Sequence, residues 1–167
     1  MKSFDQFRLA VLDDVSATVK KRSATPPMHF LIENSQGQLE PTGPIWRNEA
    51  EKRNAPAVMR RWIRKQQPGQ LAVVGESFSV QWPTEAERSI RPSENPRRRH
   101  LVSVWFFVRG HGKSEVWDAD VLKDADGQIY LGEWRALDPK HTPSGELFDP
   151  VFEAMNHKAN SMRRFFG

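Results

Sequence analysis

Three consecutive stretches of the chain, residues 100–110, 114–124 and 127–137, show the two-residue side-chain period of β-strands. Short turns separate them, and the second turn contains Asp126-Gly127, a residue pair that favours a tight hairpin. Three strands joined in this way predict an antiparallel meander. Because a meander must bury its apolar face, the chain is limited to folds in which a sheet is covered by other elements.

An amphipathic helix is predicted before the sheet, over residues 3–22. Its apolar side chains recur at steps of three and four, which places them on one side of a helix. Ser3 and Gln6 have the spacing of a capping box, in which each side chain bonds the backbone of the other residue. The expected buried stripe consists of Phe4, Phe7, Val11, Val15 and Val19.

Two more helices are predicted, over residues 48–67 and 150–164. Either Asn48 or Asn54 is a suitable N-cap for the first of them, because a short polar side chain can accept a backbone hydrogen bond there. The expected buried stripe of that helix consists of Val58, Met59, Trp62 and Ile63.

The remaining apolar stretches predict a hairpin, over residues 28–34 and 39–45, and a further strand over residues 71–82. Prolines in the second arm of the hairpin keep that strand short or at an edge of the sheet. The predicted order is therefore α-β-β-α-β-β-β-β-α in a single domain of residues 1–167. This is an α+β fold whose mainly antiparallel sheet combines an N-terminal hairpin with a C-terminal four-strand meander. We expect its helices to pack on one face of the sheet.

Composition narrows the class of protein. The chain has 167 residues, of which 38% are hydrophobic and 28% charged, as is typical of a globular domain with its own core. No apolar run approaches the ~18 residues of a membrane-spanning helix, so we expect a cytoplasmic protein with no membrane partner. The absence of cysteine excludes thiolate chemistry. No metal-binding histidine spacing and no glycine-rich nucleotide motif occurs, so no cofactor, metal site or catalytic residue is predicted.

Glu76 is the most unusual polar residue of the chain. Strand alternation puts it on the same face as Val74 and Phe78, where burying a lone carboxylate costs several kcal/mol. One interpretation is a general base or a ligand-binding group in a pocket. Two structural interpretations stand beside it: a bulge at Gly75 that changes the register, or an ion pair with an arginine.

An arginine-rich polar segment, residues 83–99, joins the strand that carries Glu76 to the meander, and it is long for a connection inside a domain. Its arginines could clamp a phosphate or a carboxylate in a bidentate manner. The alternative is that one of them anchors the segment to the sheet while the others are solvated. The candidate binding residues here are Arg91, Arg97, Arg98 and Arg99.

The tripeptide GES, followed by RPSENPRRR and a strand, resembles a pattern in small bacterial or phage proteins of unassigned function. Those proteins carry "SEAW … RPSEDPxR" before a β-meander. The likeness covers residues 70–135, and Phe78 stands where the pattern has tryptophan. The resemblance implies an α+β fold with no known activity, and it implies that Glu76, Arg91 and Arg97 belong to one structural unit.

Basic side chains are the argument for a nucleic-acid partner. The formal net charge is +4, and Arg60, Arg61 and Arg64 lie on the outer side of the second predicted helix. Together with residues 97–99 they would form an electrostatic footprint if both groups shared one side of the molecule. Glutamates near both groups dilute this charge, namely Glu49, Glu51, Glu85, Glu87 and Glu94.

These features predict a soluble accessory or protein-interaction module of bacterial or phage type that is not catalytic. The alternative is a nucleic-acid-associated protein that uses the basic helix and the arginine-rich loop. A third possibility is an enzyme with Glu76 in a pocket. The proline-bearing edge strand leaves formation of a homodimer open.

Overall fold

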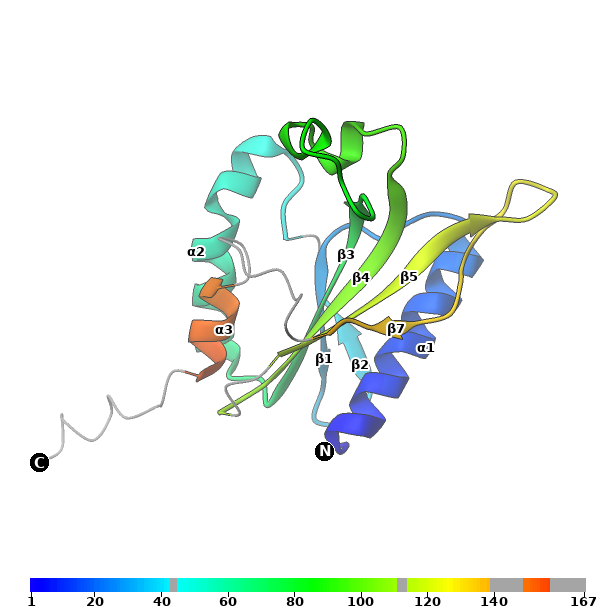
Figure 1. The fold of residues 1–167 in the computed structure, drawn as a ribbon. Coiled ribbons are helices and arrows are strands. Elements are labelled where there is room, and N and C mark those ends of the chain that lie inside the picture. Colours follow the sequence, from blue (N-terminus) through cyan, green and yellow to red (C-terminus); the bar gives the residue numbers. More distant parts are fainter. Residues whose placement is uncertain (43–44, 111–113, 139–148, 157–167) are drawn as a thin grey trace, which may run out of the picture.

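The computed structural model describes residues 1–42, 45–110, 114–138 and 149–156, and these residues fold around one antiparallel sheet flanked by helices (Figure 1). The helices are α1 (Phe4–Arg22), α2 (Glu49–Gln66) and α3 (Asp149–Asn156). The strands are β1 (His29–Glu33), β2 (Leu39–Pro41), β3 (Gln70–Ser79), β4 (Arg99–Val108), β5 (Ser114–Lys123), β6 (Ile129–Leu131) and β7 (Arg135–Ala136). The predicted α+β class and antiparallel sheet are confirmed.

The sheet runs in the order β2-β1-β3-β4-β5-β6, with β7 also paired to β5. The centre of the sheet is the pairing of β3 with β4, which extends from Gln70 opposite Val108 to Ser79 opposite Arg99. This pairing passes through Gly75 without a break in register. A bulge at Gly75 was one of the explanations considered for Glu76, and it is wrong.

The last strand of the meander is interrupted, contrary to the single strand predicted over residues 127–137. Both β6 and β7 pair with β5, but residues 132–134 between them face only residues 119 and 120. The extra residue breaks the ladder, as a bulge does. Within the break, Trp134 Nε1 donates a hydrogen bond to Ser16 Oγ at 2.8 Å. The interruption therefore ties this edge of the sheet to α1.

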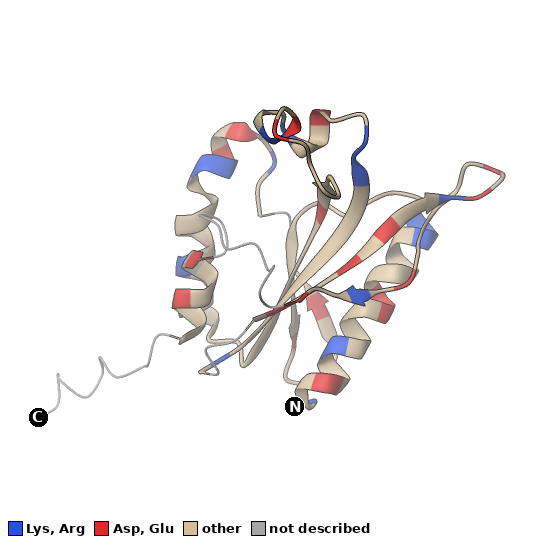
Figure 2. Cartoon of the chain, in the orientation of Figure 1, with Lys and Arg blue, Asp and Glu red and all other residues tan. Residues whose placement is uncertain are grey.

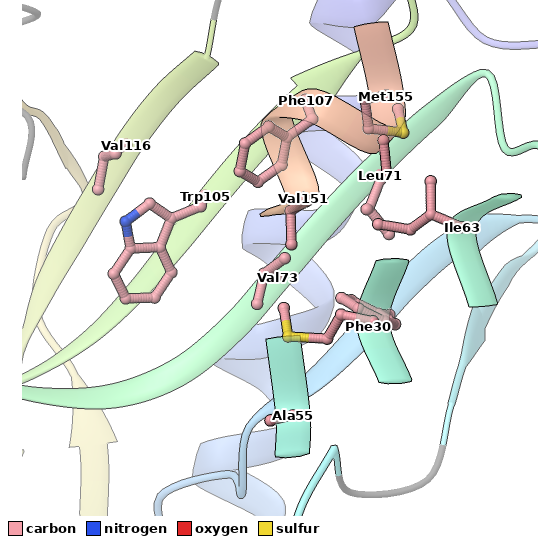
Figure 3. Close-up of a cluster of buried hydrophobic side chains, with 12 residues drawn as sticks. Phe30, Ala55, Ile63, Leu71, Val73, Trp105, Phe107, Val116, Val151 and Met155 are labelled. Carbon is pink, nitrogen blue, oxygen red and sulfur yellow. The ribbon is translucent and has the colours of Figure 1, made fainter. Parts of the chain in front are cut away.

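Helices cover both faces of the sheet, so the prediction of helices on one face is wrong (Figure 1). Helix α1 packs on the face that carries Val74, Val104 and Phe106. Helices α2 and α3 pack on the opposite face, against residues such as Val73 and Phe107 (Figure 3). The physical reason is that even- and odd-numbered residues of β3 and β4 are both apolar, so both faces must leave water.

The first two helices are bounded nearly as predicted. Ser3 and Gln6 form the predicted capping box of α1, and the N-cap of α2 is Asn48, whose Oδ1 accepts a hydrogen bond from the Glu51 backbone at 2.8 Å. Of the predicted stripe of α2, Met59 and Ile63 are fully buried and Trp62 is partly buried against the same core, whereas Val58 is wrong. Val58 is 52% exposed, whereas the fully buried residues are Ala55, Met59 and Ile63.

The third helix is described over Asp149–Asn156, and the rest of the predicted helix, residues 157–164, lies outside the described residues. The predicted second arm of the hairpin likewise extends over residues 43 and 44, which are outside the described part of the chain. Among the described helices, none is long and apolar enough to span a membrane.

Phe106 is the side chain by which β4 holds α1, and its truncation tests the α1-facing core. It is fully buried and makes edge-to-face contacts with Phe4 and Phe7 at ring-centroid distances of 6.1 and 6.2 Å. We expect Phe106→Ala to lower the free energy of unfolding by about 3–5 kcal/mol, because it removes a buried ring and leaves a cavity. Urea denaturation measures this loss. Leu9→Ala, at an exposed position of α1, serves as the control and should change stability by less than ~0.5 kcal/mol.

Candidate functional site

Glu76 lies at the surface of the α1-facing side of the sheet, with its side chain 37% exposed. Its Oε2 accepts a hydrogen bond from Thr25 Oγ1 at 2.8 Å. Its Oε1 is 2.9 Å from Nε2 of His100, within ion-pair range but not aligned for a hydrogen bond. No arginine among the described residues lies within ion-pair distance of Glu76. The proposed arginine partner is therefore wrong, and the partner is a histidine.

The order of these groups differs from that of a nucleophilic triad. In a triad the imidazole lies between the hydroxyl and the carboxylate, so that it can remove the hydroxyl proton. Here the carboxylate of Glu76 lies between Thr25 and His100, and the imidazole stacks on Phe78 with ring centroids 4.8 Å apart. The arrangement ties the α1–β1 connection to β3 and β4, and among the described residues no imidazole contacts the Thr25 hydroxyl.

The connection between β3 and β4, residues 80–98, is hereafter called the β3–β4 loop. It contains two short 3₁₀ turns, Glu87–Ser89 and Pro92–Glu94. Glu87 is its centre, because its carboxylate accepts hydrogen bonds from Arg97 Nε and Nη2 at 3.0 and 2.6 Å and from Asn95 Nδ2 at 2.7 Å. These donors, Arg97 foremost, lower the pKa of Glu87 to about 2.

Asn95 fixes the same loop from inside. It is 1% exposed, and its Oδ1 accepts a hydrogen bond from the Arg97 backbone at 2.8 Å. Its own side-chain amide holds Glu87, so one asparagine connects both partners of the ion pair. The β3–β4 loop is therefore stapled by its own side chains, and its polar groups face one another.

The predicted binding arginines of the loop differ in the contacts that their side chains make. Arg98 lies over the Phe78 ring at 5.7 Å, and its Nη1 donates to the Asn95 carbonyl at 3.4 Å. Arg99 forms a bidentate pair with Asp120, at 2.8 and 3.1 Å from Nη2 to the two carboxylate oxygens. Arg91 is exposed and has no side-chain partner among the described residues. Since Arg97 holds Glu87, most of these arginines serve the fold, and Glu76 and Arg97 belong to separate networks.

A ladder of charges on the other face of the sheet was missed by the sequence prediction. Arg135 Nη2 is 3.1 Å from both Asp118 Oδ1 and Asp120 Oδ2, and Asp120 also holds Arg99. Asp118 is only 7% exposed, so Arg135 is the charge that compensates its burial. The alternating acids of β5 were visible in the sequence, but their arginine partners depend on strand register. No group of three metal-ligating side chains occurs in the described part of the chain.

The predicted basic group on α2 is partly neutralised. Arg60 Nη2 is 3.6 Å from Glu153 Oε2, which links α2 to α3. Arg61 and Arg64 are exposed, and within the described ranges they have no carboxylate at ion-pair distance. Figure 2 shows acidic residues in the first turn of α2, on the neighbouring α3 and among the basic residues of the β3–β4 loop. The arginines of the two elements therefore do not form a purely basic surface.

Trp82 is the exposed residue that the sequence prediction missed, because it was counted as the last residue of a strand that in fact ends at Ser79. The indole is 85% exposed, and the backbone of Trp82 is left-handed, with φ of 51°. Ile90, in the same loop, is also exposed. The loop thus exposes two large apolar side chains to water, while its polar side chains Glu87, Asn95 and Arg97 bind one another.

No protein-family model matches the chain, and neither a curated protein nor a solved structure resembles it closely enough to count as a match. A function therefore has to be argued from the chemistry of the site itself.

Removing the central carboxylate should loosen the β3–β4 loop. We expect Glu87→Gln to speed tryptic cleavage after Arg88 and Arg98, because the substituted amide cannot hold the Arg97 guanidinium as an ion pair. Limited proteolysis followed by mass spectrometry measures the two cleavage rates. Glu85→Gln, an exposed carboxylate of the same loop, is the matched control and should leave both rates unchanged.

The same pair gives the loop a defined pH dependence. Because the pKa of Glu87 in the folded chain is about 2, below its ordinary value of 4.5, its stabilisation is complete above that ordinary value. It is lost as the pH falls through the folded value. Hydrogen exchange of the loop amides in the parent protein should therefore remain slow at pH 4 relative to Glu87→Gln. Equal exchange rates in the two proteins at that pH would contradict the claim that the Glu87 carboxylate orders the loop.

Proposed function

We propose that this chain is a non-catalytic protein-interaction module whose docking element is the β3–β4 loop. The observation that carries the proposal is Trp82, which is 85% exposed on a left-handed backbone. That conformation costs about 1–2 kcal/mol for a residue with a side chain, and the exposed ring recovers none of it within the fold. Strain of this kind is typical of sites that act on something outside the fold.

The rigidity of the loop supports the proposal. Its staple of Glu87, Asn95 and Arg97 is formed without a partner, so a partner does not have to pay for ordering the loop. Tryptophan is also the residue type most enriched among interface residues that dominate binding energy. A preordered loop that presents an exposed indole has the properties of an anchor for another protein.

The non-catalytic part of the proposal rests on the Glu76 site. Its carboxylate is occupied by Thr25 and His100, in an order that differs from the hydroxyl–imidazole–carboxylate order of a nucleophilic triad. Elsewhere in the described structure, the carboxylates nearest the loop, Glu87 and Asp120, are each held by an arginine. A carboxylate held in this way is a poor proton acceptor, because the cation stabilises its ionised form.

Peptide selection tests the docking element. Peptides enriched from a random display library on the parent protein should bind Trp82→Ala at least ten-fold more weakly, because the indole supplies the central contact. Isothermal titration calorimetry with the synthesised peptides measures the two affinities. Leu9→Ala, an exposed apolar residue on α1, is the control and should bind them as the parent does.

Two results would contradict this function. One is that no peptide is enriched on the parent protein over Trp82→Ala. The other is that the enriched peptides bind Leu9→Ala and Trp82→Ala with equal loss, because the effect would then come from apolar surface in general and not from the loop.

Nucleic-acid association is the second candidate function. It is favoured by Arg61 and Arg64, which are exposed one helical turn apart on α2 without a carboxylate partner in the described residues. It is weakened because Arg60, Arg97 and Arg99 hold carboxylates of the protein itself. An arginine that gives up such a partner to a phosphate gains less than a free arginine does.

Salt dependence separates this candidate from general charge attraction. If it is correct, mixed-sequence DNA stays bound at ~150 mM salt, and Arg61→Gln/Arg64→Gln reduces the salt slope of binding by about 2, one for each lost phosphate contact. Fluorescence anisotropy with labelled DNA measures the slope. The matched control is Lys21→Gln/Arg22→Gln at the exposed end of α1. Binding that disappears at ~150 mM salt, or an equal effect of both double variants, would exclude α2 as a nucleic-acid site.

A further inference from the structure

A large open cavity lies at the opposite end of the β3–β4 pairing from the loop. Its volume is about 1040 Å³, close to the upper size of pockets that hold small molecules. It is bordered by the start of α1, the start of β3, the end of β4 and the start of β5, near the N-terminus in Figure 1. Neither Glu76 nor Trp82 lines it, so the cavity is separate from the features described above.

The walls of the cavity are mainly apolar. Phe106 and Val108 contribute from β4, and Phe4 contributes from the first turn of α1. Phe4 is only partly buried, although it packs edge-to-face on Phe106. The α1-facing core is thus left open at this end, and it presents aromatic and aliphatic surface to whatever enters.

One buried oxygen acceptor in the cavity lining has no donor among the described residues. Gln70 is 6% exposed; its Nε2 donates to the Lys2 carbonyl at 2.7 Å, while its Oε1 has no partner. Glu115, the carboxylate of the lining, is partly exposed and accepts hydrogen bonds from Arg8 at 3.2 Å and from Trp117 at 3.1 Å. A buried acceptor without a donor is unusual in a folded protein. It points to a group that donates from outside the chain.

The carboxylates around the cavity are paired with cations, whereas Arg109 has no carboxylate partner among the described residues. Lys2 pairs with Glu33, and Glu115 pairs with Arg8. The Arg109 guanidinium, also in the lining, turns toward the Pro68 carbonyl and the sulfur of Met155, at 2.9 and 3.9 Å. A cationic ligand would therefore find no unpaired carboxylate among the described lining residues, and a carboxylate ligand could not donate a hydrogen bond to Gln70 Oε1. An uncharged alcohol can donate that hydrogen bond without displacing an ion pair.

From these observations, we infer that the cavity binds an uncharged, largely apolar small molecule that donates a hydrogen bond, of the aromatic or aliphatic alcohol class. The apolar part would contact Phe4, Phe106 and Val108. The hydroxyl would donate to Gln70 Oε1.

A matched pair of probes tests the donor. 2-Naphthol and 2-methoxynaphthalene have the same ring system, but the ether cannot donate a hydrogen bond. We expect 2-naphthol to shift the amide NMR signals of residues 2–4, 69–70 and 106–109, and to bind at least ten-fold more tightly than the ether. Titrations followed by ¹H–¹⁵N correlation spectra give both the location and the affinity.

Variants locate the site independently of the probe. Val108→Trp adds bulk to the cavity wall and should abolish binding, whereas Val58→Trp, the same change at an exposed position of α2, should leave it unchanged. Gln70→Met keeps the length of the side chain without the acceptor and should bring the affinities of the two probes to within a factor of three. Thermal melting of each variant shows whether it is folded, and Val108→Trp carries the test if Gln70→Met is not.

The inference is overturned if both probes bind the parent protein equally, if neither shifts the named amides, or if Val58→Trp weakens binding as much as Val108→Trp. Trp82→Ala should leave 2-naphthol binding unchanged. The cavity and the proposed docking loop can therefore fail or succeed separately.

Discussion

The pairing of β3 with β4 is the constraint on which the other parts of the molecule depend. It is continuous from Gln70 opposite Val108 to Ser79 opposite Arg99, and it is apolar on both faces along most of its length. Both faces must therefore be covered, by α1 on one side and by α2 and α3 on the other. The helices leave the two ends of this pairing uncovered. The β3–β4 loop lies at one of these ends and the open cavity at the other.

The class of fold was predictable because it rests on local patterns. Ser3 with Gln6, and Asp126 with Gly127, specify a helix start and a turn through neighbouring atoms. The two-sided cover was missed, although its signal was present. Residues 101–108 are an almost continuous apolar run, which is typical of a strand buried on both faces, whereas a strand with one wet face alternates apolar and polar residues.

The site was less predictable, because its contacts depend on register and on chain reversals that no local pattern encodes. Glu76 was correctly singled out as a polar residue on an apolar strand face, but its partner His100 is brought near by the β3–β4 register. Arg135 reaches Asp118 only because the chain is interrupted after β6 and pairs again one residue out of step. The sequence shows which charges need a partner, while the tertiary fold decides which partner each one receives.

The same pairing explains why a basic composition does not produce a basic surface here. Once Arg97 and Arg99 are held by Glu87 and Asp120, their charges determine where the β3–β4 loop lies rather than what it attracts. Long-range electrostatic steering needs an uncompensated field, which such pairs remove. What distinguishes the loop from the surrounding surface is then the exposed ring of Trp82, whose contribution to binding is short-ranged and depends on shape. In this loop the ion pairs fix the position of the chain, and in the proposed function the indole makes the contact with a partner.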